Sequence, residues 1–343
     1  MDFRWGLHNY SMLKCRAWLC HAGLIFGVVN HALRLMKTAS ETSTLSDGFG
    51  VAPATTGRLR TPSRANDFYE LTKPRLNFLV LVTTMVGYYM AVRVPGDWVR
   101  VIHTLVGTAL TAAGASVLNQ VIERKHDKLM LRTQMRPLPD GRISVAHGIL
   151  YGCVLGIAGV AYLIWFVNGL TAILGAFTIL SYLFVYTPMK RWTSLNTVVG
   201  AIAGAIPPVM GWTAVTGQFG RCAAALFCLL FFWQIPHFLA IAILYRRDYA
   251  AGGFKMLPVV DQDLYVTGRQ IVLYNAALIP ITLMPTLFRM TGVVYFAAAL
   301  VLGLAYLSFG IICATTRQRA VARKLFFASI IYLPTAVCGD DDE

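Results

Sequence analysis

Charged side chains are scarce in this chain. Asp, Glu, Lys and Arg make up 13% of its 343 residues, whereas a soluble domain typically carries about 25%. This scarcity excludes an ordinary soluble globular protein. Hydrophobic residues make up 57% of the chain, which is typical of a single bundle of membrane-spanning helices rather than two or three soluble domains.

Paired cysteines and basic soluble modules are also lacking. The seven cysteines form no CxxC pair and show no His/Cys ligand spacing, so a disulfide framework and a zinc site are both disfavoured. The formal net charge is +14, but no soluble basic module accompanies it, and we expect no nucleic acid as a partner. Excess cations on the cytoplasmic loops of a membrane protein explain such a charge equally well.

Long apolar runs dominate what is present, and they predict an all-α polytopic membrane protein. A spanning helix needs about 20 mostly apolar residues. The last candidate is short and contains Pro334. We expect about nine spans, at 76–93, 99–121, 145–166, 169–187, 195–216, 222–245, 270–288, 292–314 and 323–338.

Lys and Arg are distributed unevenly around these spans. Sixteen of the 30 lie in or beside the connections after spans 2, 4, 6 and 8, four lie at the other connections, and ten precede the first span. This asymmetry predicts that the N-terminus and the even-numbered connections face the cytoplasm, or the matrix in a mitochondrion. Most acidic residues of the loops lie on the same side, so we expect the chemistry there.

The chain divides into three parts by composition. Residues 1–66 form an N-terminal extension that we expect to be largely disordered, with an apolar stretch that fits an interfacial helix, a weak span or a transit peptide. Residues 67–338 form the membrane domain, and 339–343 form an acidic tail. The extension is not a convincing presequence, so a bacterial inner membrane is favoured over a mitochondrial one.

Polar residues gather at the foot of the second span, in "LNQVIERKHDKLMLRTQMRPLP". Asn119, Glu123 and Asp127 are spaced i, i+4, i+8 and therefore share one face of a helix. Their oxygen-only donor set suits Mg²⁺ better than zinc or copper. The alternative interpretation is a solvated helix end at a membrane surface. The cations nearby would suit phosphate groups, and they are Arg124, Lys125, Arg132 and Arg136.

Two further polar clusters lie on the same side of the membrane. Asp248 follows Arg246 and precedes the flexible pair Gly252–Gly253, and the connection after span 4 adds Lys190 and Arg191. Acidic and basic residues on three successive connections of one side predict a metal–diphosphate pocket at the mouth of the bundle.

Five stretches together resemble the UbiA superfamily of intramembrane prenyltransferases, on the branch that farnesylates heme. They run in family order from about residue 67 to 334 and read "ELTKPRLNFLVLVTTMVGYYMA", "LNQVIERKHDKLMLRTQMRPLP", "YTPMKRWTSLNTVVGAIAGAIPPVMGW", "FFWQIPHF" and "RRDYAAGGFKMLPVV". The Asn-x-x-x-Glu-x-x-x-Asp spacing alone indicates the superfamily, and the joint presence of the other motifs indicates the branch.

The resemblance implies nine helices around a central cavity, with two acidic motifs that hold Mg²⁺ against farnesyl diphosphate. Asn119, Glu123 and Asp127 match the first motif, and Asp248 matches the second. A second acid often follows four residues later in the superfamily, but this chain has Gly252 there. The resemblance implies the same catalytic and metal-binding role for all four polar residues. The cations expected to bind diphosphate are Arg132, Arg136, Lys190, Arg191 and Arg246.

The implied reaction transfers the farnesyl group to a vinyl group of heme B, which gives heme O for terminal oxidase assembly. His237 and Arg75 are the candidate heme-binding residues, and a packing role for His237 stays open. Lys73 and Arg75 are either snorkelling anchors or partners for diphosphate or heme propionates, and the anchor is favoured for Lys73. The expected partners are farnesyl diphosphate, heme B, membrane lipid and a downstream heme A synthase or terminal oxidase.

Four aromatic residues of span 4 and its connection are candidates to shield an allylic cation, or are ordinary lipid-facing rings. They are Tyr182, Phe184, Tyr186 and Trp192. Two other functions stay open: prenyl transfer to an aromatic quinone precursor, and secondary transport of an anion. A transporter is disfavoured because its substrate site would lie near the bilayer midplane, often between inverted repeats.

Overall fold

The computed structural model describes residues 63–92, 97–287 and 292–337, so the expectations for residues 1–62 and for the acidic tail lie outside the described residues. Within these ranges the chain forms helices and no strand. The helices run in chain order as α2 (Arg64–Leu71), α3 (Pro74–Ala91), α4 (Trp98–Asp127), α5 (Val145–Phe166), α6 (Gly169–Leu180), η1 (Ser181–Tyr186), α7 (Thr187–Trp192), α8 (Asn196–Gly204), α9 (Ile206–Thr216), α10 (Arg221–Leu244), α11 (Arg246–Ala251), α12 (Leu257–Val260), α13 (Tyr265–Leu287), α14 (Val293–Thr316) and α15 (Arg319–Val337).

Seven stretches of the described residues are long and apolar enough to cross a membrane. They are α4, α5, the continuous run from α6 to α7, the pair α8 and α9, α10, α13 and α14. The two other predicted spans correspond to α3 and α15, which carry cations in their first turns and pack against α4 and α14 in the same bundle. The prediction of an all-α polytopic membrane protein is confirmed.

Local sequence signals set where several helices begin. The side chains of Ser63, Asp97, Ser144 and Asn168 each accept a hydrogen bond from a backbone N–H in the first turn of the following helix. These caps satisfy donors that no intrahelical carbonyl can reach. Pro74 stands at the first position of α3, where its missing N–H costs nothing.

Glycines allow the first half of the bundle to pack closely. A Cβ on Gly114 would collide with the backbone of Gly156 on α5, and one on Gly211 of α9 would collide with the carbonyl of Thr84 on α3. Small residues let membrane helices approach until their backbones touch. The second half has a conventional side-chain core, in which buried residues of α10, α13, α14 and α15 form one cluster.

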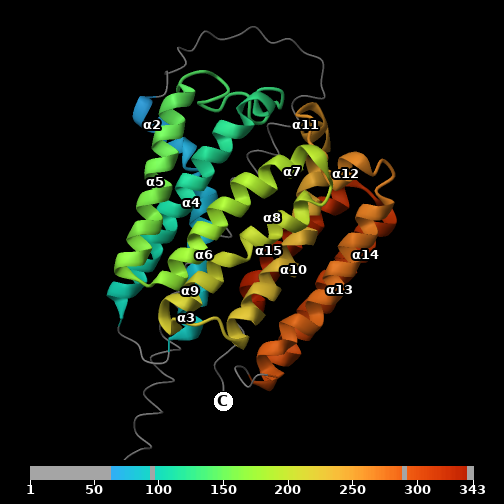
Figure 1. Ribbon diagram of the computed structural model, residues 1–343. Coiled ribbons are helices and arrows are strands. Elements are labelled where there is room, and N and C mark those ends of the chain that lie inside the picture. Colours follow the sequence, from blue (N-terminus) through green and yellow to red (C-terminus); the bar gives the residue numbers. More distant parts are fainter. Residues whose placement is uncertain (1–62, 93–96, 288–291, 338–343) are drawn as a thin grey trace, which may run out of the picture.

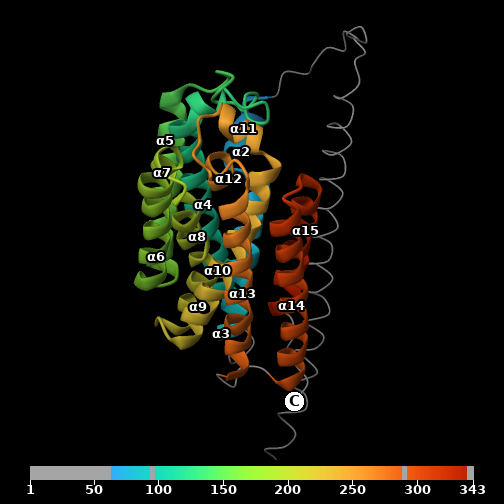
Figure 2. The same cartoon turned by 90° about the vertical axis from the view of Figure 1, so that its right-hand side faces the viewer.

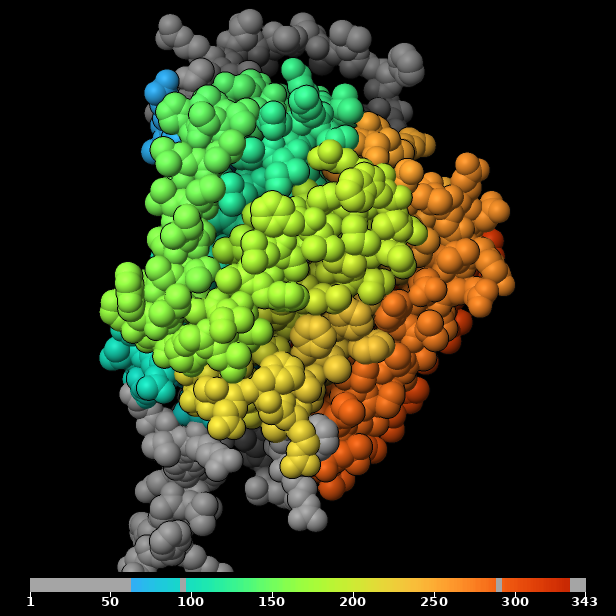
Figure 3. Space-filling view, in the orientation of Figure 1, coloured from blue at the N-terminus to red at the C-terminus, as the bar shows by residue number. Residues whose placement is uncertain are grey.

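The two halves lie side by side in one bundle, with α5 at one flank and α13 and α14 at the other (Figure 1). On the face seen in Figure 3, side chains from α6 to α10 fill the surface between these flanks. The short helices α2, α11 and α12 lie at the end of the bundle where α4 ends and α5 begins (Figures 1 and 2). This end carries the predicted polar clusters.

Candidate active site

The predicted row of ligands lies on a buried face of α4. Asn119, Glu123 and Asp127 are 1%, 5% and 1% exposed. The alternative of a solvated helix end is therefore wrong for these three residues. Burying two carboxylates is costly unless each is paired, so their partners define the electrostatics of the site.

Each oxygen ligand in the row accepts a hydrogen bond from a cationic side chain that comes from a different segment. The three contacts are Lys73 Nζ to Asn119 Oδ1 at 2.9 Å, Lys190 Nζ to Glu123 Oε1 at 2.7 Å, and Arg136 Nη1 to Asp127 Oδ2 at 2.8 Å. Three cations thus converge on three aligned oxygens, which is the arrangement needed to hold an anion together with a metal.

The ammonium group of Lys73 bonds to the row and does not snorkel to the membrane surface, so the favoured interpretation as an anchor was wrong. Lys73 has a left-handed backbone with φ of 49° immediately before Pro74, and its ammonium group bonds to Asn119. Burial and the neighbouring Arg136 guanidinium lower the pKa of Lys73 to about 7, against the opposing effect of Glu123. A lysine at the end of a span usually snorkels, but the side chain of this one reaches Asn119.

Lys190 lies in an aromatic setting that η1 provides. Its ammonium group is 4.5 Å from the centroid of the Tyr186 ring and 5.8 Å from that of Phe254. The π-helix η1 ends at Tyr186, and π-helical turns occur frequently at functional sites. Tyr182 and Tyr186 have centroids 5.2 Å apart. These two rings lie beside the ion pair.

The four aromatic candidates divide into two groups. Tyr182 and Tyr186 are partly buried near Lys190, whereas Phe184 is 69% exposed and Trp192 is 73% exposed. The structure therefore brings only the two tyrosines to the site. The two exposed rings match the alternative interpretation of lipid-facing or interfacial aromatics.

The loop between α4 and α5 connects the row to the second cluster. Arg132 lies over the rings of Tyr245 and Tyr249, at 4.7 and 5.7 Å from their centroids. His126 Nδ1 and the carbonyl oxygen of Gly252 are 2.8 Å apart. These contacts hold α11 and its Gly–Gly turn against the end of α4.

Asp248 lies in the first turn of α11, partly buried and next to Tyr249. Among the described residues, no group of three or more His, Cys, Asp and Glu side chains is placed to hold a metal ion. In this conformation Asp248 therefore does not share a ligand set with Glu123 and Asp127. Their carboxylates are instead occupied by Lys190 and Arg136.

Other predicted cations occupy different places. Arg191 donates to the carbonyl of Ile122, and its buried Nε has no partner among the described residues. Arg246 donates to the backbone carbonyls of Asp261 and Gln262, which ties down the loop after α12.

Two cations that neighbour the row in sequence, and Arg75, the candidate heme-binding residue, also have their side chains elsewhere than at the row's oxygens. Arg75 is exposed in the first turn of α3. Arg124 donates to the carbonyl of Val121 on its own helix, and Lys125 is exposed. Arg124 and Lys125 line a separate pocket.

His237 lies on α10, where it faces α15. Its Nδ1 is 2.7 Å from Ser329 Oγ, and its ring stacks on Trp233 at 5.0 Å and lies 4.9 Å from Phe326. Ser329 Oγ also bonds the carbonyl of Phe326, and when its hydrogen is used there, the hydroxyl accepts from the Nδ1–H tautomer of the histidine. In that tautomer the Nε2 atom of His237 carries the lone pair, which is the form that can ligate iron.

Comparison with known proteins identifies the relatives of this chain. The profile of the UbiA prenyltransferase family matches residues 80–331. A "Protoheme IX farnesyltransferase" of Solibacter usitatus is 47% identical over 277 residues, which covers 78% of this chain and 95% of that protein. A protein of the same description from Myxococcus xanthus is 43% identical over 275 residues, with 79% and 92% covered.

Solved structures share the fold at low sequence identity. A digeranylgeranylglyceryl phosphate synthase superposes with a TM-score of 0.67 at 16% identity, covering 80% of this chain and 98% of that one. A UbiA homolog from Archaeoglobus fulgidus bound to DMAPP and Mg²⁺ superposes with a TM-score of 0.62 at 17% identity, covering 79% and 97%.

Proposed function

Because the chain belongs to the UbiA prenyltransferase family, we propose that it transfers the farnesyl group of farnesyl diphosphate to a vinyl group of heme B. The product would be heme O. The observation that carries the proposal is the buried row of Asn119, Glu123 and Asp127 with a cation on each oxygen. The relatives described as protoheme IX farnesyltransferases favour heme as the acceptor over a quinone precursor.

The donor set of the row fits a magnesium ion. One amide oxygen and two carboxylates lie along one face of α4, and Mg²⁺ takes one or two carboxylates while substrate phosphate and water complete its shell. The A. fulgidus homolog binds Mg²⁺ together with a prenyl diphosphate. When bound, Mg²⁺ would neutralise the charge that develops on the leaving diphosphate. Asp248 would add a ligand from α11.

The three cations of the row would change partners when the substrate binds. In the structure Lys73, Lys190 and Arg136 donate hydrogen bonds to the oxygens that the metal would take. Diphosphate brings negative charge that the same cations can bind instead, by small rotations of long side chains. The site is therefore stable without substrate, and its positive charge is available when the allylic C–O bond breaks.

The reaction that follows conserves atoms and electrons. The electron pair of the allylic C–O bond leaves with diphosphate, the vinyl π electrons of heme form the new C–C bond, and water adds to the resulting cation and loses a proton. Tyr182 and Tyr186, beside Lys190, would shield the farnesyl cation by cation–π contact and limit premature reaction with water.

Heme would bind through His237 and Arg75. The unprotonated Nε2 of His237 supports a contact to heme iron, and the exposed Arg75 could pair with a propionate. A spectroscopic titration tests the first contact. Heme B added to the purified protein should show an imidazole-type Soret shift that His237→Leu removes and Phe238→Leu, a neighbouring change, retains.

The enzyme is an integral membrane protein. We further propose a bacterial inner membrane, with the N-terminus and the active-site end in the cytoplasm, because the two relatives described above are bacterial and the cations gather at that end. Heme O synthesis there would supply a downstream heme A synthase or a terminal oxidase.

An activity assay tests the function directly. Purified protein is incubated with Mg²⁺, farnesyl diphosphate and heme B, and the farnesylated heme is detected by mass. We expect product with heme and none with a quinone precursor. Asp127→Asn should abolish turnover, whereas Asp140→Asn, which removes an exposed carboxylate from the loop after α4, should leave it within about twofold.

Other outcomes would point to the other functions. Product with a quinone precursor alone would assign a different acceptor, and passage of labelled diphosphate across vesicles without a covalent product would favour transport. Full turnover by Asp127→Asn would show that the row does not hold the metal.

A further inference from the structure

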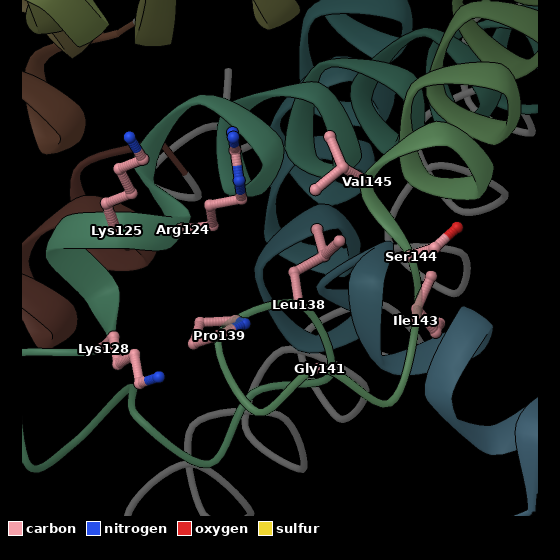
Figure 4. A pocket seen from close by; sticks show the side chains of 9 residues that line it. All are labelled: Arg124, Lys125, Lys128, Leu138, Pro139, Gly141, Ile143, Ser144 and Val145. Atoms are coloured by element: carbon pink, nitrogen blue, oxygen red, sulfur yellow. The ribbon is translucent and has the colours of Figure 1, made fainter.

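A pocket lies on the other side of the end of α4, away from the row of oxygen ligands. It has a volume of about 320 Å³. Arg124, Lys125 and Lys128 of α4 and the first turn after it form one side, while the loop that reaches α5 forms the other (Figure 4). We call it the α4–α5 pocket. None of the functions assigned to the row uses it.

The charge of the α4–α5 pocket is positive, and the described residues do not match it. Among them, three cations and no acid line the pocket. Lys125 and Lys128 are exposed, and neither forms an ion pair among the described residues. The nearest acids in sequence are already paired, since Glu123 bonds Lys190, Asp127 bonds Arg136 and Asp140 bonds Arg142. A concave group of cations attracts an anion.

The start of α5 adds to this attraction. Ser144 and Val145 line the pocket, and α5 begins at Val145 and runs for 22 residues. The first backbone N–H groups of a helix carry partial positive charge and favour phosphate. The cations and this helix terminus are independent parts of the same cavity.

The position of the pocket relative to the bilayer indicates the source of the anion. A helix of 30 residues such as α4 is about 45 Å long, whereas the hydrocarbon core is about 30 Å thick. The last turns of α4 therefore stand among the lipid headgroups. Apolar side chains of the following loop are exposed there, with Leu131 at 78%, beside Leu129 and Met135. Such side chains suit the membrane interface rather than water.

We propose that the α4–α5 pocket binds the phosphate headgroup of an acidic phospholipid from the adjacent leaflet. Arg124, Lys125 and Lys128 would contact the phosphate. The acyl chains would run along α5, where Ile149 is exposed one turn beyond Val145 on the same face of the helix. The charge, the depth and the apolar neighbours all fit this lipid class.

Bound lipid would also act on the active site through the loop that the two sites share. The segment that closes the pocket, around Leu138 and Gly141, directly follows Arg136, which bonds Asp127. The same loop carries Arg132, which lies over the tyrosines at α11. A headgroup in the pocket would hold this loop in place, so acidic lipid should raise the rate of prenyl transfer.

Native mass spectrometry of the full-length protein tests the binding. Phosphatidylglycerol or phosphatidylcholine is titrated into the detergent-solubilised protein, and retained lipid is counted. Each cation near an acidic lipid raises the binding affinity about fivefold. The double variant Lys125→Gln/Lys128→Gln should therefore bind phosphatidylglycerol about 25-fold more weakly than wild type. The matched control Arg323→Gln/Lys324→Gln removes two exposed cations from the start of α15 and should change nothing.

Competition measurements distinguish a lipid headgroup from soluble phosphate as the ligand of the pocket. Inorganic phosphate and glycerol 3-phosphate, as competitors, should displace phosphatidylglycerol only weakly. The proposal is overturned if either soluble phosphate competes with bound phosphatidylglycerol as effectively as unlabelled phosphatidylglycerol does. It is also overturned if phosphatidylcholine binds with equal affinity, or if the control variant loses as much affinity for phosphatidylglycerol as the pocket variant. In vesicles of equal parts phosphatidylcholine and phosphatidylglycerol, wild type should be faster than in phosphatidylcholine alone, and the pocket variant should not respond.

Discussion

The pair of Lys190 and Glu123 gives a quantitative test of the active-site geometry. Lys190→Gln removes an ammonium group that lies 2.7 Å from Glu123 Oε1. The side chains are 13% and 6% exposed, and removing one partner of a buried ion pair costs about 3–5 kcal/mol. Because the ammonium of Lys73 also attracts Glu123, we expect the lower end, a loss of about 3 kcal/mol in the free energy of unfolding.

The same substitution should move two functional measurements in opposite directions. Loss of a cation that stabilises the leaving diphosphate should lower the rate of farnesyl transfer by about 100- to 1,000-fold. Mg²⁺ binding without diphosphate should become tighter, by about tenfold, because Lys190 no longer competes for the carboxylate of Glu123. Product mass measures the first effect, and isothermal titration calorimetry measures the second. Lys190→Arg keeps the charge and should retain more of the rate.

A double-mutant cycle decides whether the stability effect comes from the pair. Glu123→Gln combined with Lys190→Gln removes both charges, so it should be less destabilising than the sum of the single changes by about 1–3 kcal/mol. Additive losses would show that the two side chains do not interact. Unchanged turnover or weaker Mg²⁺ binding in Lys190→Gln would refute the exchange of partners at the row.

Three further predictions follow from contacts in the bundle. Gly211→Ala should destabilise the protein by about 2–4 kcal/mol, seen as a lower midpoint of thermal unfolding in detergent, because the new methyl group collides with the carbonyl of Thr84. Tyr186→Leu should reduce turnover more than tenfold, whereas Phe184→Leu, on the exposed side of the same π-helix, should stay near wild type; equal losses would contradict the division of the aromatics. Asp67→Asn should loosen α2 from the loop, because Arg142 then lacks its buried partner, and hydrogen exchange in α2 should rise.

The part of the site that is local in sequence could be predicted. Asn119, Glu123 and Asp127 share a helix, so their spacing alone places them on one face. The long apolar runs likewise predict the helices, because length and hydropathy decide what can cross a bilayer. The burial of the row, in contrast, depends on neighbours that come from other segments.

The contacts made across long sequence separations could not be predicted. Lys190 and Glu123 are 67 residues apart, and Lys73 and Asn119 are 46 apart. Lys73 has the sequence context of an interfacial anchor, but its backbone is left-handed and its side chain reaches Asn119. For Arg246 the sequence shows a cation beside Asp248, but not that its guanidinium would take the backbone carbonyls of a distant loop.

The π-helix η1 also fixes the rotational phase of everything that follows it in the same span. An α-helix turns about 100° per residue, and η1 accommodates its wider turn over Ser181–Tyr186 between α6 and α7. If the same residues continued α6 as a regular helix into α7, the residue that the wider turn absorbs would rotate everything after it by about 100°. Lys190 would then point away from Glu123, although no residue of the site had changed. The function of this segment therefore resides in its backbone conformation as much as in its composition.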